Sequence, residues 1–321
     1  MSDLPKSVTI NEEGPREGFQ IEPGPIETAR KIELIDALAQ TGLRQIQTVS
    51  FVPPKNVPGM ADADAVVAGI RRRPGVAYTA LWLNERGLLR ALASPNLDVF
   101  GTISLCPSAA FLQRNQKRTL GENYEAQRSI LQTYKKSGVK VRRGGLMATF
   151  GCNFEGDIPV DHVVGMVGQL LQLASEAEVT LDFVSLADTM AWATPTSIQR
   201  VVGSVRERFP GLRLSLHLHD TRGMGIANAF AGLQMGVDIF DAAVAGLGGC
   251  PFAGHRGAAG NVCTEDLVFL CEEMGISTGI DLDSLVETAR LAEDIVGHML
   301  PGSVKTGGTL SKFRNAQRVA V

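Results

Sequence analysis

The segment His217-Leu218-His219-Asp220 combines residue types that can bind a metal ion. Residues two apart on a β-strand project from the same face, so His217 and His219 would point together while Leu218 points away. Two imidazoles on one face can bind a divalent metal when a carboxylate joins them. A pair of hydrogen-bonded core histidines is the alternative interpretation. The chain has only five histidines, and finding two of them at a predicted strand end favours the metal.

A carboxylate that could join them lies in Gly14-Pro15-Arg16-Glu17-Gly18, which follows the predicted strand Val8–Asn11. Proline and flanking glycines make a tight backbone that presents Arg16 and Glu17 rigidly. Glu17 is a candidate metal ligand. Arg16 can hold a carboxylate, a thioester oxygen or a developing enolate through charge-assisted hydrogen bonds. A surface turn with an ordinary ion pair is the alternative.

A glycine-rich segment, Gly246–Pro251, follows the last predicted strand and carries Cys250. Glycine-rich loops at this position hold phosphate in many (β/α)₈ barrels. Cys250 can donate or accept a proton if nearby charge lowers its pKa, whereas a buried inert thiol is the alternative. Near the end of this loop, Asn261 can offer an amide oxygen to a metal or cap the helix that follows.

Asp188 closes another predicted strand, in Leu186-Ala187-Asp188-Thr189. It is a candidate general acid or base, or a partner for an arginine. A turn resembling a helix N-cap is the alternative.

The elements that must position these residues alternate along the whole chain. Short β-rich runs are each followed by a segment of helical pattern, which favours parallel strands joined by crossover helices. We predict an α/β fold, a (β/α)₈ TIM barrel. The competing doubly wound sheet would normally carry a G-x-G-x-x-G loop after the first strand, and this chain does not. The predicted strands are Val8–Asn11, Gln45–Phe51, Ala77–Leu83, Val99–Leu105, Val139–Thr149, Thr180–Leu186, Arg213–His219 and Phe240–Ala245.

The helical pattern is clearest in Ile26–Gly42 and Val160–Ala177. A further stretch, Leu282–Leu300, suggests a cap or subunit contact. We therefore predict a barrel domain over residues 1–280 and a short C-terminal helical extension over 281–321. Catalytic groups of such barrels gather at the C-terminal ends of the strands. That rule predicts that the scattered candidates form one site.

Composition narrows the function classes. The chain has 321 residues, of which 44% are hydrophobic, and a net charge of −3 with no basic block. A main nucleic-acid partner is therefore not expected, nor is a membrane, because no apolar run approaches the ~20 residues of a span. The N-terminus shows no secretory signal. Five cysteines without a C-x-x-C pair indicate reduced thiols and a cytoplasmic location.

Together, these motifs resemble the 3-hydroxy-3-methylglutaryl-CoA lyase family of metal-dependent barrel lyases and synthases. The resemblance covers nearly the whole chain, and the segment after the last strand is its most specific part. The matching segments are Gly14–Gly18 (family G-P-R-D-G), Thr48–Pro58 (T-x-S-F-V…P-K…V-P), Asp188-Thr189 (G-D-T), His217–Thr221 (H-x-H-D-T), Val244–Phe252 (V-A-G-L-G-G-C-P-Y) and Gly260–Val268.

The resemblance implies a role for each candidate. His217, His219, Asn261 and Glu17 would ligate Mg²⁺ or Mn²⁺, Arg16 would stabilise an enolate, Cys250 would move a proton at that carbanion, and Asp188 would assist proton removal from a tertiary hydroxyl. Gln20, Gln47, Ser50, Gly248 and Gly249 would line the substrate site. The expected partners are an acyl-CoA thioester and a second copy of the chain in a homodimer.

Three positions depart from the family pattern. Glu17 replaces an aspartate and is longer by one methylene. Gln47 replaces a glutamate, which removes a negative charge near Arg16. Cys250 and Asn261 are separated by two more residues than in the family, and the additional residues fall around His255-Arg256. All three changes fall in the expected pocket.

Four functions follow as hypotheses. The first is cleavage of a 3-hydroxy-3-methylglutaryl-CoA-type thioester to acetyl-CoA and acetoacetate. The second is cleavage of another branched 3-hydroxyacyl-CoA, such as citramalyl-CoA or a longer-chain analogue. An acetyl-CoA-condensing synthase and a non-catalytic acyl-CoA-binding barrel are the third and fourth.

Overall fold

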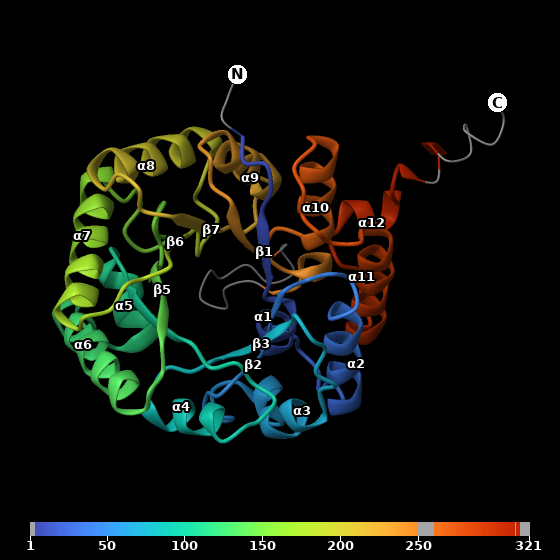
Figure 1. The fold of residues 1–321 in the computed structure, drawn as a ribbon, viewed down its shortest axis with the longest axis horizontal. Coiled ribbons are helices and arrows are strands. Elements are labelled where there is room, and N and C mark those ends of the chain that lie inside the picture. The colour runs from blue at the N-terminus through green and yellow to red at the C-terminus, as the bar shows by residue number, and fades with distance from the viewer. Residues whose placement is uncertain (1–3, 249–259, 312, 315–321) are drawn as a thin grey trace.

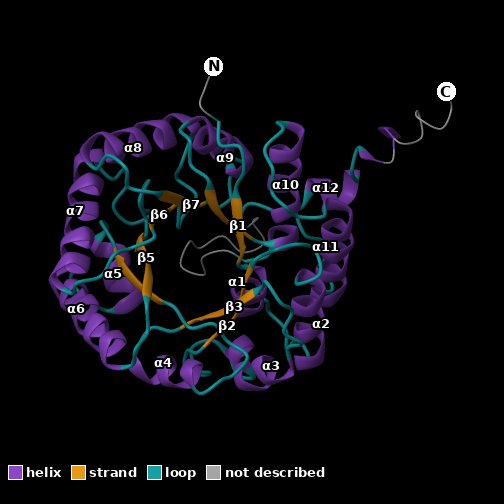
Figure 2. Cartoon of the chain, in the orientation of Figure 1, coloured by secondary structure: helices purple, strands orange, loops and turns teal. Residues whose placement is uncertain are grey.

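The structure, a computed structural model, describes residues 4–248, 260–311 and 313–314. Its strands form an inner ring and its helices an outer one (Figures 1 and 2). The strands are β1 (Thr9–Glu12), β2 (Gln45–Ser50), β3 (Ala77–Leu81), β4 (Gly101–Leu105), β5 (Val141–Leu146), β6 (Phe183–Ala187), β7 (Leu214–His217) and β8 (Ile239–Ala242).

The outer ring follows the chain around the barrel (Figure 1). The α-helices are α1 (Gly14–Ile21), which Figure 1 draws inside this ring, α2 (Thr28–Leu38), α3 (Ala63–Gly69), α4 (Glu85–Leu92), α5 (Ala109–Gln116), α6 (Leu120–Lys136), α7 (Val160–Glu176), α8 (Pro195–Arg208), α9 (Gly225–Gln234), α10 (Thr264–Glu273), α11 (Leu282–Val296) and α12 (Ser303–Gly307). Two 3₁₀ turns, η1 (Pro58–Met60) and η2 (Val244–Gly246), complete the elements.

The sheet order shows a closed barrel rather than a doubly wound sheet. Hydrogen-bonded neighbours follow the order β3-β2-β1-β8-β7-β6-β5-β4, and the paired strands are parallel. At the seam, Asp98 lies just before β4. Its amide donates to the Tyr78 carbonyl of β3 at 2.7 Å, and its carboxylate accepts from the Tyr78 amide at 2.9 Å. The predicted TIM barrel is confirmed.

Local sequence signals explain where several helices begin. Thr119 and Glu122 form a reciprocal capping box at the start of α6, and the Asn84 side chain caps α4. Such side chains satisfy amide groups that the first helical turn leaves without partners. β7 and β8 are buried along their whole length, as expected for strands covered on both faces.

Several predicted boundaries were wrong. The strand predicted to reach His219 ends at His217, and His219 instead forms an antiparallel bridge with Asn261. The segment from Gly14 is the start of α1 rather than a tight loop, because proline is well tolerated in a first helical turn. The helix predicted over Ile26–Gly42 covers only Thr28–Leu38.

The predicted C-terminal extension contains α11 and α12. Helix α11 packs against α2, α10 and the η2 turn, so it lies on the flank of the barrel (Figure 1). The domain boundary at residue 280 stays a prediction.

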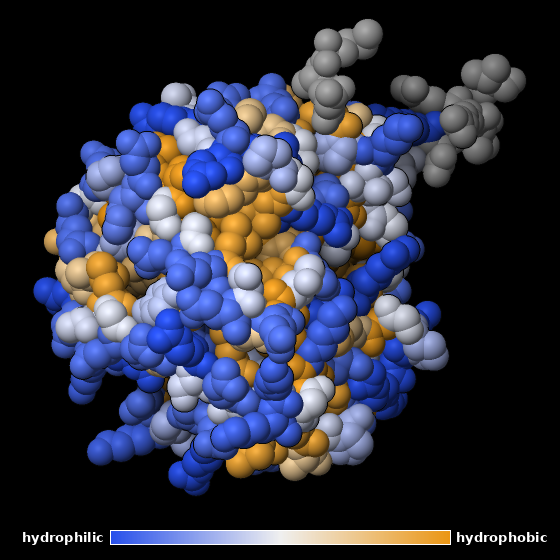
Figure 3. Space-filling model, turned by 60° about the vertical axis from the view of Figure 1, so that its left-hand side comes forward, coloured by the Kyte–Doolittle hydropathy of each residue, from blue (hydrophilic) through white to orange (hydrophobic). Residues whose placement is uncertain are grey.

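One face of the molecule is largely hydrophilic (Figure 3). On the face drawn in Figure 3, hydrophobic residues gather in a band between hydrophilic ones. Within the described ranges, no helix is long and apolar enough to cross a membrane.

Two buried carboxylates connect the first strand to the end of the barrel. Glu12 accepts hydrogen bonds from the amides of Gly14 at 2.7 Å and Val244 at 2.9 Å, and from the Thr264 hydroxyl at 2.6 Å. Glu265 accepts from the Ala245 amide at 2.9 Å. These contacts hold the η2 turn, where Ala245 has a left-handed φ of 56°, a conformation that costs free energy for a residue with a side chain.

Burial raises the pKa of Glu12 to about 7 and that of Glu265 to about 8, above an ordinary value of 4.5. Both groups therefore keep a proton in the folded chain after the unfolded chain has released it. The free energy of unfolding should then fall as pH rises from about 4.5 to about 8. We predict a smaller fall in Glu265→Gln, whose side chain is neutral at every pH. Denaturant titrations at several pH values in this range measure the free energy of unfolding. If it falls equally with pH in wild type and variant, the raised pKa of Glu265 is contradicted.

Candidate metal-binding active site

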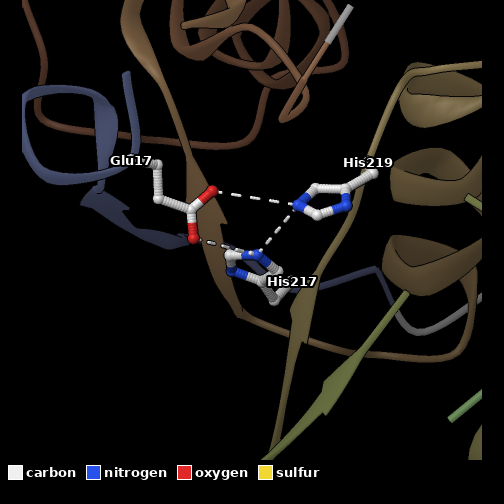
Figure 4. A group of neighbouring side chains, drawn as sticks. All are labelled: Glu17, His217 and His219. Atoms are coloured by element: carbon white, nitrogen blue, oxygen red, sulfur yellow. Dashed lines mark hydrogen bonds and ion pairs between the residues drawn. The ribbon is translucent and has the colours of Figure 1, made fainter. Parts of the chain in front are cut away.

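The ends of three chain segments bring the predicted metal ligands together. Glu17 lies in the first turns of α1, directly after β1, and His217 ends β7. His219 follows two residues later and is paired with Asn261. This pairing continues on both sides. The Val262 amide donates to the Leu218 carbonyl at 2.9 Å, and the Asp220 amide donates to the Gly260 carbonyl at 2.7 Å. Figure 4 shows Glu17 and the two imidazoles turned toward one another.

The donor atoms of this triad are close enough to share one ion. One ligand atom from each of Glu17, His217 and His219 lies within 4.8 Å of the others. The His217 Nε2 is 3.6 Å from Glu17 Oε1, and the His219 Nε2 is 3.8 Å from Glu17 Oε2. The two Nε2 atoms are 3.3 Å apart.

The outer nitrogens of both rings fix which atoms face inward. The His219 Nδ1 is 2.8 Å from the carbonyl oxygen of Thr189, and the His217 Nδ1 is 3.2 Å from Asp241 Oδ2. A carbonyl and an ionised carboxylate only accept hydrogen bonds, so each Nδ1 carries a proton. In the neutral rings the two Nε2 lone pairs then face each other. Carboxylate or carbonyl partners of this kind orient histidines that ligate metals.

Asn261 offers a further oxygen beside the triad. Its Nδ2 donates to Glu17 Oε2 and, at 3.3 Å, to the Leu247 carbonyl. Its Oδ1 is buried and has no hydrogen-bond partner among the described residues. A buried oxygen without a partner is costly. The helix α10 is preceded by Cys263 rather than Asn261, so the predicted alternative of a helix cap was wrong.

Gly248 makes the close approach of these groups possible. Its φ is +96°, and a Cβ there would lie 2.6 Å from the Glu17 Cβ and 2.9 Å from the Asn261 Nδ2. Any side chain would push one of them away.

This donor set fits a divalent cation. It combines a carboxylate oxygen, two inward imidazole nitrogens and an orphaned amide oxygen, and imidazole and oxygen donors suit several divalent metals. The structure therefore contains a possible metal-binding triad with Asn261 beside it.

Charges around the triad keep Glu17 ionised. Burial opposes ionisation, but Arg16 and His217 outweigh it and hold the pKa of Glu17 well below its ordinary value. Burial likewise works against a charged His217, yet Glu17 and Asp241 raise its pKa overall. A cation at the triad would replace that proton.

Arg16 is held on three sides. Its guanidinium contacts the carboxylates of Glu13 at 2.5 Å and Glu17 at 2.7 Å, and its Nε donates to the Gln47 side-chain oxygen. Burial opposes the charge, but Glu17 and Glu13 raise the pKa of Arg16 overall. The guanidinium therefore stays charged beside the triad.

A buried network outside the triad holds His217. Asp241 accepts from the Asn11 side-chain Nδ2 at 2.9 Å and from the Arg143 guanidinium, which also donates to the Ser185 hydroxyl at 2.8 Å. Burial would raise the pKa of Asp241, but Arg143 and His217 lower it overall. Sequence reasoning missed Glu13, Arg143 and Asp241. A carboxylate inside the otherwise apolar strand Ile239–Ala242 was the available signal for Asp241.

Asp188 lies at the end of β6, as predicted. Its Oδ1 accepts from the amides of Trp192 at 2.7 Å and Ala193 at 3.0 Å. Its Oδ2 is buried, and no residue in the described part of the chain forms a hydrogen bond with it. Burial raises the pKa of Asp188 to about 6. The backbone contacts match the turn that the sequence left open as an alternative, while Oδ2 leaves the acid–base role open.

The remaining predicted site residues are only partly described. The Ser50 hydroxyl donates to the Gln20 side-chain oxygen at 3.3 Å, which joins the end of β2 to α1. Gly249, Cys250 and the additional residues around His255-Arg256 lie outside the described residues.

Comparisons with known proteins show which family the chain resembles. A family model described as HMGL-like matches residues 7–292. The hydroxymethylglutaryl-CoA lyase YngG of Bacillus subtilis is 37% identical over 297 residues, covering 92% of this chain and 96% of its own. The 3-hydroxy-3-isohexenylglutaryl-CoA/hydroxymethylglutaryl-CoA lyase of Pseudomonas aeruginosa is 39% identical over 295 residues, covering 92% and 95%.

Solved structures give the same result. A hydroxymethylglutaryl-CoA lyase from Pseudomonas aeruginosa superposes with a TM-score of 0.85 at 37% identity, covering 98% of this chain and 99% of its own. An HMG-CoA lyase from Acinetobacter baumannii, in complex with coenzyme A and 3-methylmalate, gives 0.85 at 36% identity, covering 97% and 98%. The predicted resemblance to these carbon–carbon lyases is confirmed, and the chain belongs to the HMGL-like family.

Proposed function

We propose that the protein cleaves the C2–C3 bond of a 3-hydroxy-3-methylglutaryl-CoA-type thioester with the aid of Mg²⁺ or Mn²⁺. The products are acetyl-CoA and a keto acid, acetoacetate for the methyl substrate. The observation that carries the proposal is the convergence of Glu17, His217 and His219 beside the charged guanidinium of Arg16. The relatives named above are lyases of this kind, which favours catalysis over a non-catalytic acyl-CoA-binding barrel and over an acetyl-CoA-condensing synthase.

Four residues would hold the metal: Glu17, His217, His219 and Asn261. Oxygen donors suit Mg²⁺, and mixed oxygen and imidazole donors suit Mn²⁺. When bound, a divalent cation lowers the pKa of a coordinated hydroxyl and orients a carboxylate of the substrate.

The protein's own groups account for the other requirements of the cleavage. The 3-hydroxyl must lose its proton, and Asp188 is the proposed acceptor through its unpartnered Oδ2. As the C2–C3 bond breaks, its electron pair moves into the thioester to form an enolate. Arg16 stabilises this developing negative charge. Its guanidinium is already held in place by Glu13, Glu17 and Gln47. Protonation at C2, which we assign to Cys250, completes acetyl-CoA.

The substrate site is proposed to include Gln20, Gln47, Ser50, Gly248 and Gly249, with the acyl-CoA thioester as the partner. The size of the acyl branch is the main alternative within this function, because the Pseudomonas relative is named for both an isohexenyl and a methyl substrate. A homodimer and a cytoplasmic location remain predictions.

The first test is acetyl-CoA release from 3-hydroxy-3-methylglutaryl-CoA, alongside citramalyl-CoA and the isohexenyl homologue. We expect release that stops with EDTA, returns with Mn²⁺ and is lost in His217→Ala. If the protein prefers one of the homologues, the proposed acyl group changes but the proposed reaction stands. No release from any of the three by the folded, Mn²⁺-loaded protein would contradict the proposal.

A second test examines the residue behind His217. Asp241→Asn should weaken Mn²⁺ binding by roughly 10- to 100-fold, because the outer partner of a metal-bound histidine fixes its ring and raises its basicity. Calorimetric titration measures the affinity, and circular dichroism checks that the variant is folded. Glu287→Gln, which breaks an exposed ion pair with Arg290, serves as the control. If folded Asp241→Asn binds Mn²⁺ as tightly as wild type, Asp241 does not orient His217 for the metal.

A further inference from the structure

Glu13 is a buried carboxylate at the centre of the site that takes no direct part in the proposed reaction. It lies between β1 and α1 and is 1% exposed. Its Oε2 is 2.5 Å from the Arg16 Nη2. Its Oε1 has no hydrogen-bond partner within residues 4–248, 260–311 and 313–314, and it is 3.9 Å from the Arg143 Nη1. Two guanidinium groups therefore converge on this one carboxylate.

The three partners that Arg16 has among the described residues differ in charge and in their other contacts. Glu17 also faces the two imidazoles and, in the proposed function, serves the cation. Gln47 is a neutral amide. Glu13 is then the one partner of the three that can supply Arg16 with a full negative charge while the cation is bound. A buried guanidinium without such a partner is strongly disfavoured.

The position of Glu13 also connects the two halves of the site. On one side it contacts Arg16, and on the other it faces Arg143, which holds Asp241 and, through it, His217. Glu13 thus lies between the arginine proposed to meet the enolate and the network that orients a metal-binding histidine.

We propose that Glu13 is a positioning residue that holds the Arg16 guanidinium in register with the metal-binding triad. This inference rests on the proposed function, because it assigns Glu13 to the same reaction. Position 47 offers a specific test, since its side chain reaches the same guanidinium from β2. A carboxylate placed there can replace the one at position 13.

The experiment compares Glu13→Gln with the double variant Glu13→Gln/Gln47→Glu, each full-length and Mn²⁺-loaded. A displaced Arg16 should lower kcat by about a hundredfold in Glu13→Gln, with KM and the Mn²⁺ affinity within about twofold of wild type. The double variant should regain about tenfold or more in kcat, because the charge returns to Arg16 from the neighbouring strand. Glu287→Gln, the same change at an exposed pair, should leave kcat unchanged.

A second measurement reads Arg16 without substrate. The ¹⁵Nε–¹Hε resonance of Arg16, whose Nε donates to Gln47, should shift in Glu13→Gln and move back toward its original position in the double variant. If wild type releases no acetyl-CoA, the proposed function fails, and this resonance alone decides the role of Glu13. An unshifted resonance in Glu13→Gln overturns the inference. So does wild-type kcat in Glu13→Gln, or a folded, Mn²⁺-binding double variant no faster than the single one.

Discussion

The site depends on two imidazole nitrogens that face each other so closely that a proton or a cation must lie between them. The Nδ1 atoms of His217 and His219 are committed to Asp241 and to the Thr189 carbonyl, so in the neutral rings both Nε2 lone pairs point inward, 3.3 Å apart. Lone pairs so close repel each other unless a proton or a cation lies between them. Glu17 and the orphaned oxygen of Asn261 add further negative potential. A divalent cation bound at the triad would offset this repulsion.

Much of the surrounding fold serves to maintain it. Asp241 on β8 orients His217 on β7, and Arg143 on β5 neutralises Asp241. The bridge between His219 and Asn261 holds the Asn261 side chain beside Glu17. Gly248 permits this crowding because it has no Cβ to collide with Glu17. On the other side of the site, Glu13 and Gln47 hold Arg16, so strands β1, β2, β5, β7 and β8 all contribute.

The sequence predicted the barrel and the triad because both follow local rules. Alternating strands and helices indicate a parallel sheet, and residues two apart on a strand share a face. Catalytic residues of such barrels lie at the C-terminal ends of the strands. It did not predict that β7 ends at His217, since the bridge to Asn261 depends on a segment far along the chain. Nor did it distinguish Glu13 from its neighbour Glu12, because both follow the same short strand. Glu12 braces the η2 turn, whereas Glu13 meets Arg16, and only the folded chain separates these roles. The lost charge at Gln47 was visible in the sequence, but the carboxylate that compensates for it was not.

The central claim is that both histidines present Nε2 to one divalent cation, and electron spin-echo envelope modulation of the Mn²⁺-loaded protein tests it most directly. The account predicts ¹⁴N couplings from two imidazoles in wild type and from one in His219→Gln. Couplings that are absent in wild type, or identical in wild type and variant, would show that the paired histidines do not form the metal site.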